Sequence, residues 1–241
     1  MIPKTIHYCW FGNTSKPSYF FKCLKSWKIA FPGFEFLEWN ESNSDLSHPF
    51  LLRAVKEKKW AFVSDFVRIS KLYEYGGIYL DTDMLFVKSF DQNLLNYQFF
   101  LGMEDSKSLS AGIIGASQLN FYMQDILKHY DTVTFNSFEE ILIPRILNSV
   151  YLKYGNHSIV CGEFQKGLIL PFWVFYSLPF KLKQFHWKQF LRQDSLAVHL
   201  WAGSWMGYSK IPFTTRILSK IKYWVSKYYV PKSFLIYARS I

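Results

Sequence analysis

The amino-acid sequence predicts an α/β domain that is built on a largely parallel sheet. Segments with the periodicity of strands and of helices alternate through the N-terminal half, in the order strand, helix, strand, helix, strand. Of the 241 residues 50% are hydrophobic and 20% are aromatic, which is enough to fill a substantial core. Two aspartates, Asp81 and Asp83, interrupt the apolar pattern where one of these strands is expected to end.

The first strand–helix–strand unit follows from the local sequence. Apolar residues alternate over 2–10, which predicts a strand. Pro17 suits the start of a helix over 18–31, and the Pro-Gly pair that follows suits its end. Residues 34–39 are rich in aromatic side chains and predict the second strand.

Two helices then lead to the strand that precedes the aspartates. A polar loop is followed by a short helix, expected near 49–58. The next segment has apolar residues at helical spacing: Phe62, Val63, Phe66, Val67, Ile69, Leu72 and Tyr73. Gly76 and Gly77 suit the end of this helix, and residues 78–80 begin the strand.

The second half of the chain predicts further strands and helices. Strands are expected over 98–104, 110–116 and 195–201. Residues 167–176 are expected to begin as a strand and to continue as a loop. Helices are expected over 119–130 and 138–150, the second interrupted or bent by Pro144. Because no repeat or linker divides the chain, we expect one domain over 1–209 and an appendage over 210–241.

Cysteine usage and hydropathy indicate a cytoplasmic protein. Cys9, Cys23 and Cys161 have neither paired nor metal-ligand spacing, as expected of reduced, buried thiols. No run of about 18 apolar residues is present, so we expect no transmembrane helix. Residues 1–12 have too short an apolar run for a signal peptide, and no small-residue cleavage site follows.

Positive charge is concentrated in the last third of the chain. The net charge is +10, and Asp194 is the only acidic residue after Glu163. The same region contains twelve basic residues: Lys166, Lys181, Lys183, Lys188, Arg192, Lys210, Arg216, Lys220, Lys222, Lys227, Lys232 and Arg239. Such an excess indicates an anionic partner, either nucleic acid or an acidic membrane surface.

The appendage has the pattern of a basic amphipathic helix. One helical face gathers Ile217, Leu218, Ile221, Trp224, Val225 and Tyr228, and the basic residues lie largely elsewhere. A helix of this kind can lie in a membrane interface, which would make the protein peripheral on the inner face of the cell membrane. A surface helix packed on the domain explains the pattern equally well.

Asp81 and Asp83 have the chemistry of a metal site. In open α/β sheets, ligands bind beyond the carboxyl ends of the strands, where these aspartates are expected. One residue separates them, so an extended segment would place both carboxylates on one face. Two hard oxygen ligands suit Mg²⁺ or Mn²⁺, which can neutralise a diphosphate leaving group. A lone D-x-D triplet also fits a solvated turn.

The surrounding sequence resembles a known enzyme family. Residues 62–85, FVSDFVRISKLYEYGGIYLDTDML, resemble the sugar-nucleotide-binding segment of DXD-motif glycosyltransferases of the family 32 type. That group includes capsular-polysaccharide transferases, yeast initiating mannosyltransferases and the glucosyltransferase domains of clostridial toxins. Residues 2–12 resemble the opening strand of the family, and residues 199–205 its closing motif. The resemblance implies a GT-A type, Rossmann-like nucleotide-sugar-binding fold with a mixed, mostly parallel central sheet.

The resemblance assigns the donor-binding residues. Trp10 matches an aromatic residue that stacks on the donor base. Asp65 and Arg68 match a pair that contacts the donor sugar and its nucleotide, and their spacing would place them on one helical face. Tyr79 matches a position near the donor. Ser204 and Trp205 resemble residues of a closing loop that touch the diphosphate.

The resemblance also assigns the metal ligands. Asp83 matches the principal ligand, and Asp81 matches a carboxylate associated with the ribose and the metal. His199 matches a late histidine that completes the metal site, and a structural or diphosphate-binding histidine stays an open alternative. His7, inside the first strand, is expected to be a core histidine.

The implied activity is retaining, metal-dependent transfer of a hexose from a nucleotide-diphosphate sugar. UDP and GDP donors both fit, with Mn²⁺ or Mg²⁺ as the cofactor. The basic, aromatic appendage favours a lipid-linked saccharide acceptor, as in bacterial surface polysaccharide synthesis. Residues on the acceptor side are expected after the central strand, at Glu104, Asp105 and 110–112. Glu139 and Glu140 fit a solvated helix face better, and Ile143-Pro144 departs from the Gly-Pro of many family members.

Three other functions are less consistent with the sequence. A phosphatase of the haloacid-dehalogenase type has Thr or Val two residues after its second aspartate, where this chain has Leu85. A nucleic-acid-binding protein would fit the charge, but no recognition motif is present, so we expect no nucleic-acid partner. A non-catalytic nucleotide-sugar- or carbohydrate-binding protein derived from such an enzyme is the main alternative, although intact Asp81 and Asp83 argue against it.

Overall fold

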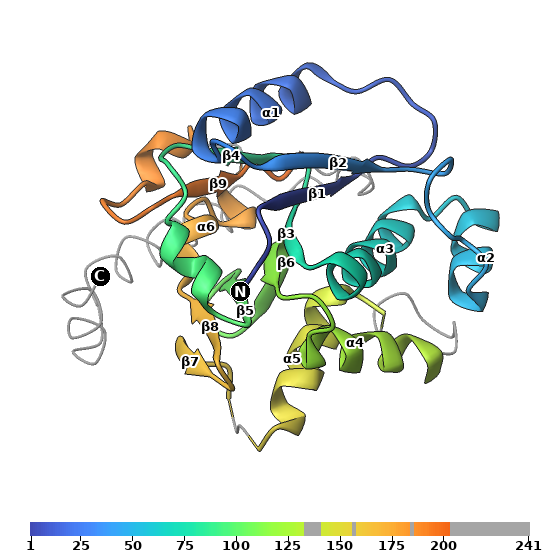
Figure 1. The fold of residues 1–241 in the computed structure, drawn as a ribbon. Coiled ribbons are helices and arrows are strands. Elements are labelled where there is room, and N and C mark those ends of the chain that lie inside the picture. The colour runs from blue at the N-terminus through green and yellow to red at the C-terminus, as the bar shows by residue number, and fades with distance from the viewer. Residues whose placement is uncertain (133–140, 156–157, 184–185, 203–241) are drawn as a thin grey trace.

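The computed structural model describes residues 1–132, 141–155, 158–183 and 186–202. In this part of the chain a seven-stranded mixed sheet forms the centre of the fold, as expected (Figure 1). Its strands are β1 (Thr5–Cys9), β2 (Glu35–Trp39), β3 (Gly77–Leu80), β5 (Phe99–Met103), β6 (Leu109–Ala116), β7 (Gly162–Phe164) and β8 (Gly167–Leu170). Their order across the sheet is β2-β1-β3-β6-β5-β8-β7.

The sheet is mixed but mostly parallel, which confirms the predicted fold class. Strands β1, β2, β3, β5 and β8 run in one direction, and β6 and β7 run in the other. The carboxyl ends of β1, β3 and β5 and the amino end of β6 therefore share one edge of the sheet. That edge is where an α/β fold places its ligands.

Six helices and a small second sheet surround the central sheet in the described residues. The helices are α1 (Ser18–Ala30), α2 (Pro49–Lys56), α3 (Trp60–Tyr75), α4 (Phe121–Thr132), α5 (Ile143–Lys153) and α6 (Phe172–Phe175). Short 3₁₀ turns cover Gln92–Asn96, Phe180–Leu182 and Trp187–Phe190. The second sheet pairs β4 (Met84–Phe86) with β9 (Ala197–His199) in antiparallel register.

Each face of the central sheet buries its own hydrophobic core. One core lies under α2 to α5, and the other lies under α1, β4 and α6. The alternation of side chains along β3 shows the division, because Tyr79 belongs to the first core while Ile78 and Leu80 belong to the second. Figure 1 shows α1 on one side of the sheet and α3, α4 and α5 on the other.

Two predicted elements were wrong in detail. Pro144 does not bend a helix; it occupies the first turn of α5, where a missing backbone N–H costs nothing. The loop expected after β8 contains the short helix α6, which begins after Pro171. Residues 138–140 of the expected helix lie outside the described residues, as does the appendage, so the domain boundary stays a prediction.

Two glycines join α3 to β3 in the way that the sequence predicts. Gly76 ends the helix with φ of 66°, and its N–H donates to the Leu72 carbonyl. Gly77 has φ of 114°, and a Cβ there would lie 2.6 Å from the Thr5 carbonyl oxygen and 2.8 Å from His7 Nε2. Both the backbone conformation and the close approach to β1 therefore require glycine.

We predict that Gly77→Ala lowers the free energy of unfolding by about 3 kcal/mol or more. The positive φ contributes about 1–2 kcal/mol and overpacking about 1–3 kcal/mol. Gly33→Ala is the matched control, because Gly33 has φ of 79° but open space around it. Urea denaturation of both variants measures the difference, and equal losses would show that contact with β1 contributes nothing.

Candidate active site

Three potential metal ligands converge at the carboxyl edge of the central sheet. Ligand atoms of Asp81, Asp83 and His199 all lie within 4.8 Å of one another. Asp81 follows β3, Asp83 precedes β4, and His199 ends β9. The sequence places His199 more than a hundred residues after the aspartates, so the fold alone brings the three together.

The two aspartates lie on a turn, which corrects the expectation of an extended segment. The Met84 N–H donates to the Asp81 carbonyl at 3.0 Å and closes the turn. The Asp81 N–H donates to the Gly112 carbonyl at 2.8 Å, which ties the turn to β6. The carboxylates still meet, because the turn returns the chain toward β9.

Pairing between β4 and β9 holds Asp83 against His199. Met84 lies opposite His199 in the register. Asp83 Oδ1 is 2.9 Å from His199 Nε2, and Asp83 Oδ2 accepts a hydrogen bond from the Ala202 N–H at 2.8 Å. The Leu200 N–H donates to the Asp83 carbonyl at 3.0 Å. Asp83 is thus fixed by the segment that follows β9.

The Asp83–His199 pair is electrostatically coupled. Burial alone would lower the pKa of His199, but the Asp83 charge, with smaller contributions from Asp81 and Glu104, raises it. Burial alone would raise the pKa of Asp83, but His199 and the Ala202 N–H lower it. His199 Nδ1 is buried and has no hydrogen-bond partner among the described residues.

Arg68 connects helix α3 to the first aspartate. Its guanidinium lies 2.8 Å from Asp65 Oδ1 and 3.1 Å from Asp81 Oδ1. It also donates to the Ala111 carbonyl at 2.8 Å and stacks 4.4 Å from the centre of the Tyr79 ring. The predicted pairing of Asp65 and Arg68 on one helical face is therefore confirmed, and the pair is buried rather than on the surface.

Two carboxylates thus share one buried cation. Burial alone would lower the pKa of Arg68, but Asp81 first, then Tyr79 and Asp65, raise it, so the guanidinium stays charged. Burial raises the pKa of Asp65 to about 7 against the opposing charge of Arg68. The Tyr79 hydroxyl donates to Asp81 Oδ1 at 3.1 Å, so Arg68 and Tyr79 together orient Asp81.

The structure adds Tyr176 to the site, which sequence reasoning missed. Its hydroxyl accepts the Ile113 N–H at 2.8 Å, and its ring lies 5.8 Å from the His199 ring. A Cβ on Gly112 would lie 3.1 Å from both Asp81 Oδ2 and the Tyr176 hydroxyl, so glycine leaves space beside the aspartate. No local pattern distinguishes Tyr176 from its aromatic neighbours in the sequence.

Other predicted residues lie at or near this edge. Trp10 follows β1, is partly exposed, and donates from its indole to the Thr14 carbonyl at 2.8 Å. Glu104 follows β5, where burial raises the pKa of its carboxyl while the charge of His199 opposes the shift. Ser204, Trp205, Glu139 and Glu140 lie outside the described residues.

His7 is a core histidine, as expected. It is fully buried, Nε2 donates to the Gly76 carbonyl at 2.8 Å, and Nδ1 accepts the Trp39 indole N–H at 3.0 Å. Burial lowers its pKa. Both ring nitrogens are satisfied, so His7 has a structural role.

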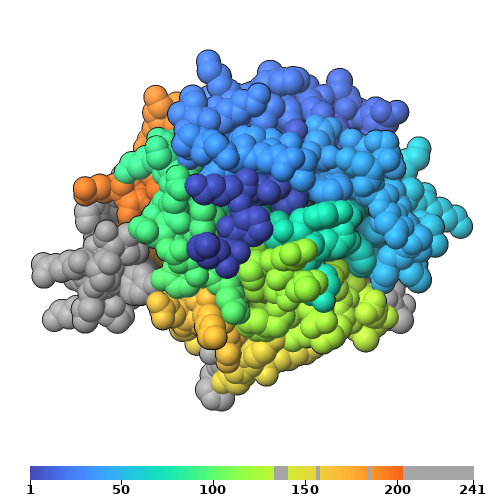
Figure 2. Space-filling view, viewed as in Figure 1, coloured from blue at the N-terminus to red at the C-terminus, as the bar shows by residue number. Residues whose placement is uncertain are grey.

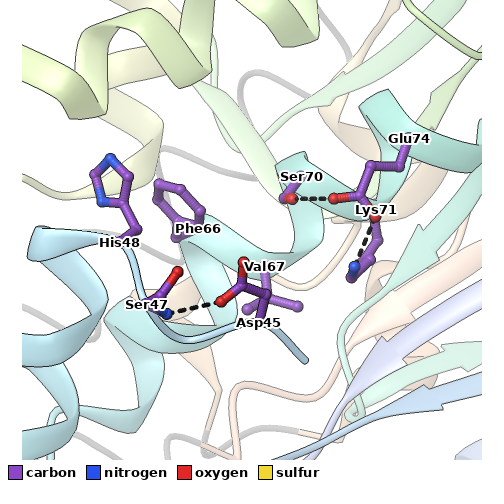
Figure 3. Close-up of a pocket in the computed structure, with 8 residues that line it drawn as sticks. All are labelled: Asp45, Ser47, His48, Phe66, Val67, Ser70, Lys71 and Glu74. Atoms are coloured by element: carbon purple, nitrogen blue, oxygen red, sulfur yellow. Dashed lines mark hydrogen bonds and ion pairs between the residues drawn. The ribbon is translucent and has the colours of Figure 1, made fainter. Parts of the chain in front are cut away.

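A separate pocket lies between α3 and the loop that precedes α2 (Figure 3). Its volume is about 240 Å³, and it is lined by Asp45, Ser47, His48, Phe66, Val67, Ser70, Lys71 and Glu74. The Ser70 hydroxyl and the Lys71 ammonium both bond to Glu74, and the Ser47 N–H donates to Asp45. These polar groups satisfy one another, and none belongs to the carboxylate cluster.

The carboxylate cluster fits a divalent cation. Two carboxylates and one imidazole are ligands that Mn²⁺ accepts, and oxygen ligands suit Mg²⁺. The unpartnered Nδ1 of His199 shows that the second ring nitrogen is not committed to another described group. Asp81 and Asp83 would supply the oxygen ligands, and His199 the nitrogen.

Comparison with known proteins finds a family match in the first half of the chain. Residues 17–100 match the family described as "Glycosyltransferase sugar-binding region containing DXD motif". This range contains both aspartates and Arg68 and ends before His199. The structure named "PaToxG Glycosyltransferase" has a similar fold, with a TM-score of 0.50 and 16% identity over 64% of this chain and 70% of that one.

Curated relatives match at low identity. The lactosylceramide 4-alpha-galactosyltransferase of Rattus norvegicus is 27% identical over 156 residues, covering 58% of this chain and 40% of the relative. The inositol phosphoceramide mannosyltransferase 3 of Schizosaccharomyces pombe is 26% identical over 140 residues, covering 56% of this chain and 39% of the relative. The matched region thus spans about two fifths of these relatives. Residues 17–100 of this chain therefore match the DXD-containing sugar-binding region of glycosyltransferases, and the two curated relatives named above are themselves glycosyltransferases.

Proposed function

We propose that this protein is a retaining, metal-dependent glycosyltransferase of the family 32 type. It would move a sugar from a UDP- or GDP-linked donor to a saccharide acceptor that is attached to a lipid. The observation that carries the proposal is the convergence of Asp81, Asp83 and His199 beside the Arg68 cluster. These are the ligands and the fixed charges that a nucleotide diphosphate with a divalent cation requires.

The residues of the site divide the work of holding the donor. Asp81, Asp83 and His199 would hold a divalent cation, Mn²⁺ or Mg²⁺, which when bound would supply positive charge to the diphosphate leaving group. Arg68 and Tyr79 orient Asp81, while Asp65 lies beside Arg68 where a sugar hydroxyl would bind. By the resemblance, Trp10 would stack on the base, and Ser204 and Trp205 would contact the diphosphate.

Transfer on the front face of the sugar fits the state of the carboxylates. Asp65 and Asp81 both contact Arg68, and Asp83 contacts His199, so all three carboxylates are already engaged by neighbouring side chains. Stabilisation of the leaving group and placement of the acceptor hydroxyl are then the main catalytic terms. Retention of anomeric configuration follows if the acceptor attacks from the side that the diphosphate leaves.

The acceptor assignment rests on the names of the relatives and on charge. Two of the curated relatives are named for ceramide lipids, which supports a lipid-linked acceptor. No helix in the described ranges is long and apolar enough to cross a membrane. From the resemblance to capsular-polysaccharide transferases, we further propose that the reaction belongs to bacterial surface polysaccharide synthesis. It would then take place on the cytoplasmic face of a membrane.

A non-catalytic protein that binds nucleotide sugars is the second candidate. It would use the same cluster to bind a donor without turnover. A panel of UDP- and GDP-sugars with Mn²⁺ distinguishes the two, scored by thermal shift and by nucleotide release. Binding without release in the presence of every acceptor would favour the second candidate, and no metal-dependent binding would contradict both.

We predict that Asp83→Asn abolishes Mn²⁺-dependent donor binding and lowers transfer by at least about a hundredfold, because the principal ligand loses its charge. Asp45→Asn is the matched control, since Asp45 is exposed and its carboxylate accepts the Ser47 N–H within its own loop, away from the carboxylate cluster. Calorimetry with Mn²⁺ and UDP, together with a transfer assay, measures both. Equal donor binding in the two variants would remove Asp83 from the site.

We predict that Arg68→Lys destabilises the fold and weakens donor binding. A lysine keeps the charge but cannot reach Asp65, Asp81 and the Ala111 carbonyl at once, so we expect a loss of about 2 kcal/mol or more. Arg53→Lys on α2 is the control, because its pair with Glu57 is exposed and contributes about 0–1 kcal/mol. Denaturant unfolding measures both losses, and similar values would mean that Arg68 contributes no more than a surface pair.

We predict that Glu104→Gln raises the KM of the acceptor by about tenfold and leaves donor binding within about twofold, since loss of one charged hydrogen bond costs ~1.5 kcal/mol. Glu104 follows β5, near His199 but outside the set of ligands within 4.8 Å. Steady-state kinetics with each substrate varied in turn checks this. A change confined to the KM of the donor would place Glu104 on the donor side instead.

A further inference from the structure

The N-terminal segment of the chain contains positive charge that the proposed donor site does not use. Residues 1–34 contain five lysines and no acidic residue, and Glu35 is the first acid. Three of these lysines, Lys22, Lys25 and Lys28, lie on α1 and are exposed. None of the three makes an ion pair or a side-chain hydrogen bond with a described residue.

Two large apolar side chains lie among these lysines on the exposed side of α1. Phe21 is 57% exposed and Ile29 is 69% exposed. The opposite side of the helix buries Phe20, Cys23, Trp27 and Ala30 in the core. In Figures 1 and 2 the segment that contains α1 forms the upper edge of the molecule. Basic and apolar side chains are therefore combined on one outer surface, which we call the α1 surface (Phe21, Lys22, Lys25, Lys28 and Ile29).

Helix α1 is hydrogen-bonded to β4, the strand that directly follows Asp83. The buried Trp27 indole donates to the Met84 carbonyl at 2.6 Å, and the Phe86 N–H donates to the Ser26 hydroxyl at 3.0 Å. Met84 directly follows Asp83. Because α1 is tied to both ends of β4, a partner that holds α1 also fixes the position of the site relative to itself.

We propose that the α1 surface is a docking surface for an anionic lipid bilayer. Lysines attract the negative headgroups, while Phe21 and Ile29 enter the boundary between headgroups and acyl chains, the combination that interfacial helices use. The inference deepens the proposed function, because an enzyme whose acceptor is attached to a lipid must sit on that lipid's membrane.

Two other occupants fit the α1 surface less well. The segment after residue 202 contains seven basic residues and no acid, so its charge repels α1 rather than complementing it. Nucleic acid would account for the lysines but not for two exposed apolar side chains among them. Leu52 on α2 is also exposed, at 59%, but the adjacent Arg53 is paired with Glu57.

Vesicle co-sedimentation of the full chain tests the proposal without donor, metal or turnover. Vesicles of phosphatidylcholine mixed with phosphatidylglycerol are compared with vesicles of phosphatidylcholine alone. Two α1 variants are used: the triple variant Lys22→Gln, Lys25→Gln, Lys28→Gln and the double variant Phe21→Gln, Ile29→Gln. The matched controls are Leu52→Gln and the exposed-lysine triple variant Lys56→Gln, Lys58→Gln, Lys107→Gln. All of these side chains are exposed, and thermal unfolding verifies that each variant is folded.

We expect the wild-type protein to bind the anionic vesicles. The lysine variant should bind them about a hundredfold more weakly and the apolar variant about tenfold more weakly, whereas both controls should bind like the wild type. Absence of binding, equal binding by the α1 variants and the wild type, or equal loss in the controls would overturn it. If the lysine variant lost more affinity for single-stranded oligonucleotides than for anionic vesicles, the proposal would be overturned in favour of a nucleic-acid partner. Asp83→Asn is expected to bind vesicles normally, so failure of the donor site and failure of the docking surface give different results.

Discussion

The candidate site depends on one contact, between Asp83 and His199. The two side chains are 2.9 Å apart although 116 residues separate them in the sequence. The contact forms because β4 pairs with β9, and the Ala202 and Leu200 N–H groups complete it by binding the side chain and the carbonyl of Asp83. Each partner shifts the pKa of the other toward its charged form, so opposite charge as well as the hydrogen bond holds the two side chains together in a buried place. Without this pairing, Asp81 and Asp83 would be two acids on a turn, with no third ligand.

Arg68 makes the buried negative charge of the site tolerable. Asp65 and Asp81 both contact its guanidinium, and the Ala111 carbonyl takes a further N–H. Burial raises the pKa of Asp65 to about 7 even against the charge of Arg68, so loss of that charge would raise it further. Arg68 therefore connects the stability of α3 and β6 with the orientation of Asp81. The α1 helix has a comparable relation to Asp83, since its buried Trp27 holds the Met84 carbonyl at the start of β4.

Short-range sequence patterns predicted the elements whose causes lie in neighbouring residues, above all helix α3 and its end. The apolar spacing from Phe62 to Tyr73 gave α3, and Gly76 ended it, because helix periodicity and a positive φ are read from neighbouring residues. The pairing of Asp65 with Arg68 followed from the same periodicity. The resemblance located the aspartates, but their geometry was wrong, because a turn replaces the expected extended segment. The pairing of β4 with β9 that brings His199 to this turn is a long-range contact without a sequence signal. Tyr176 was missed for the same reason, because its contacts with Ile113 and His199 are long-range. Roles given to Trp10, Ser204 and Trp205 stay predictions.

The claim that Asp81, Asp83 and His199 hold one divalent cation is tested most directly by pulsed electron paramagnetic resonance of the protein with Mn²⁺. A histidine nitrogen bound to Mn²⁺ modulates the electron spin echo at nitrogen frequencies, whereas carboxylate oxygens do not. We expect nitrogen modulation in the wild type that is lost in His199→Ala and kept in His186→Ala, because His186 is exposed and is not one of the three ligands. Bound Mn²⁺ without nitrogen modulation in the wild type, or with modulation that survives His199→Ala, would contradict it.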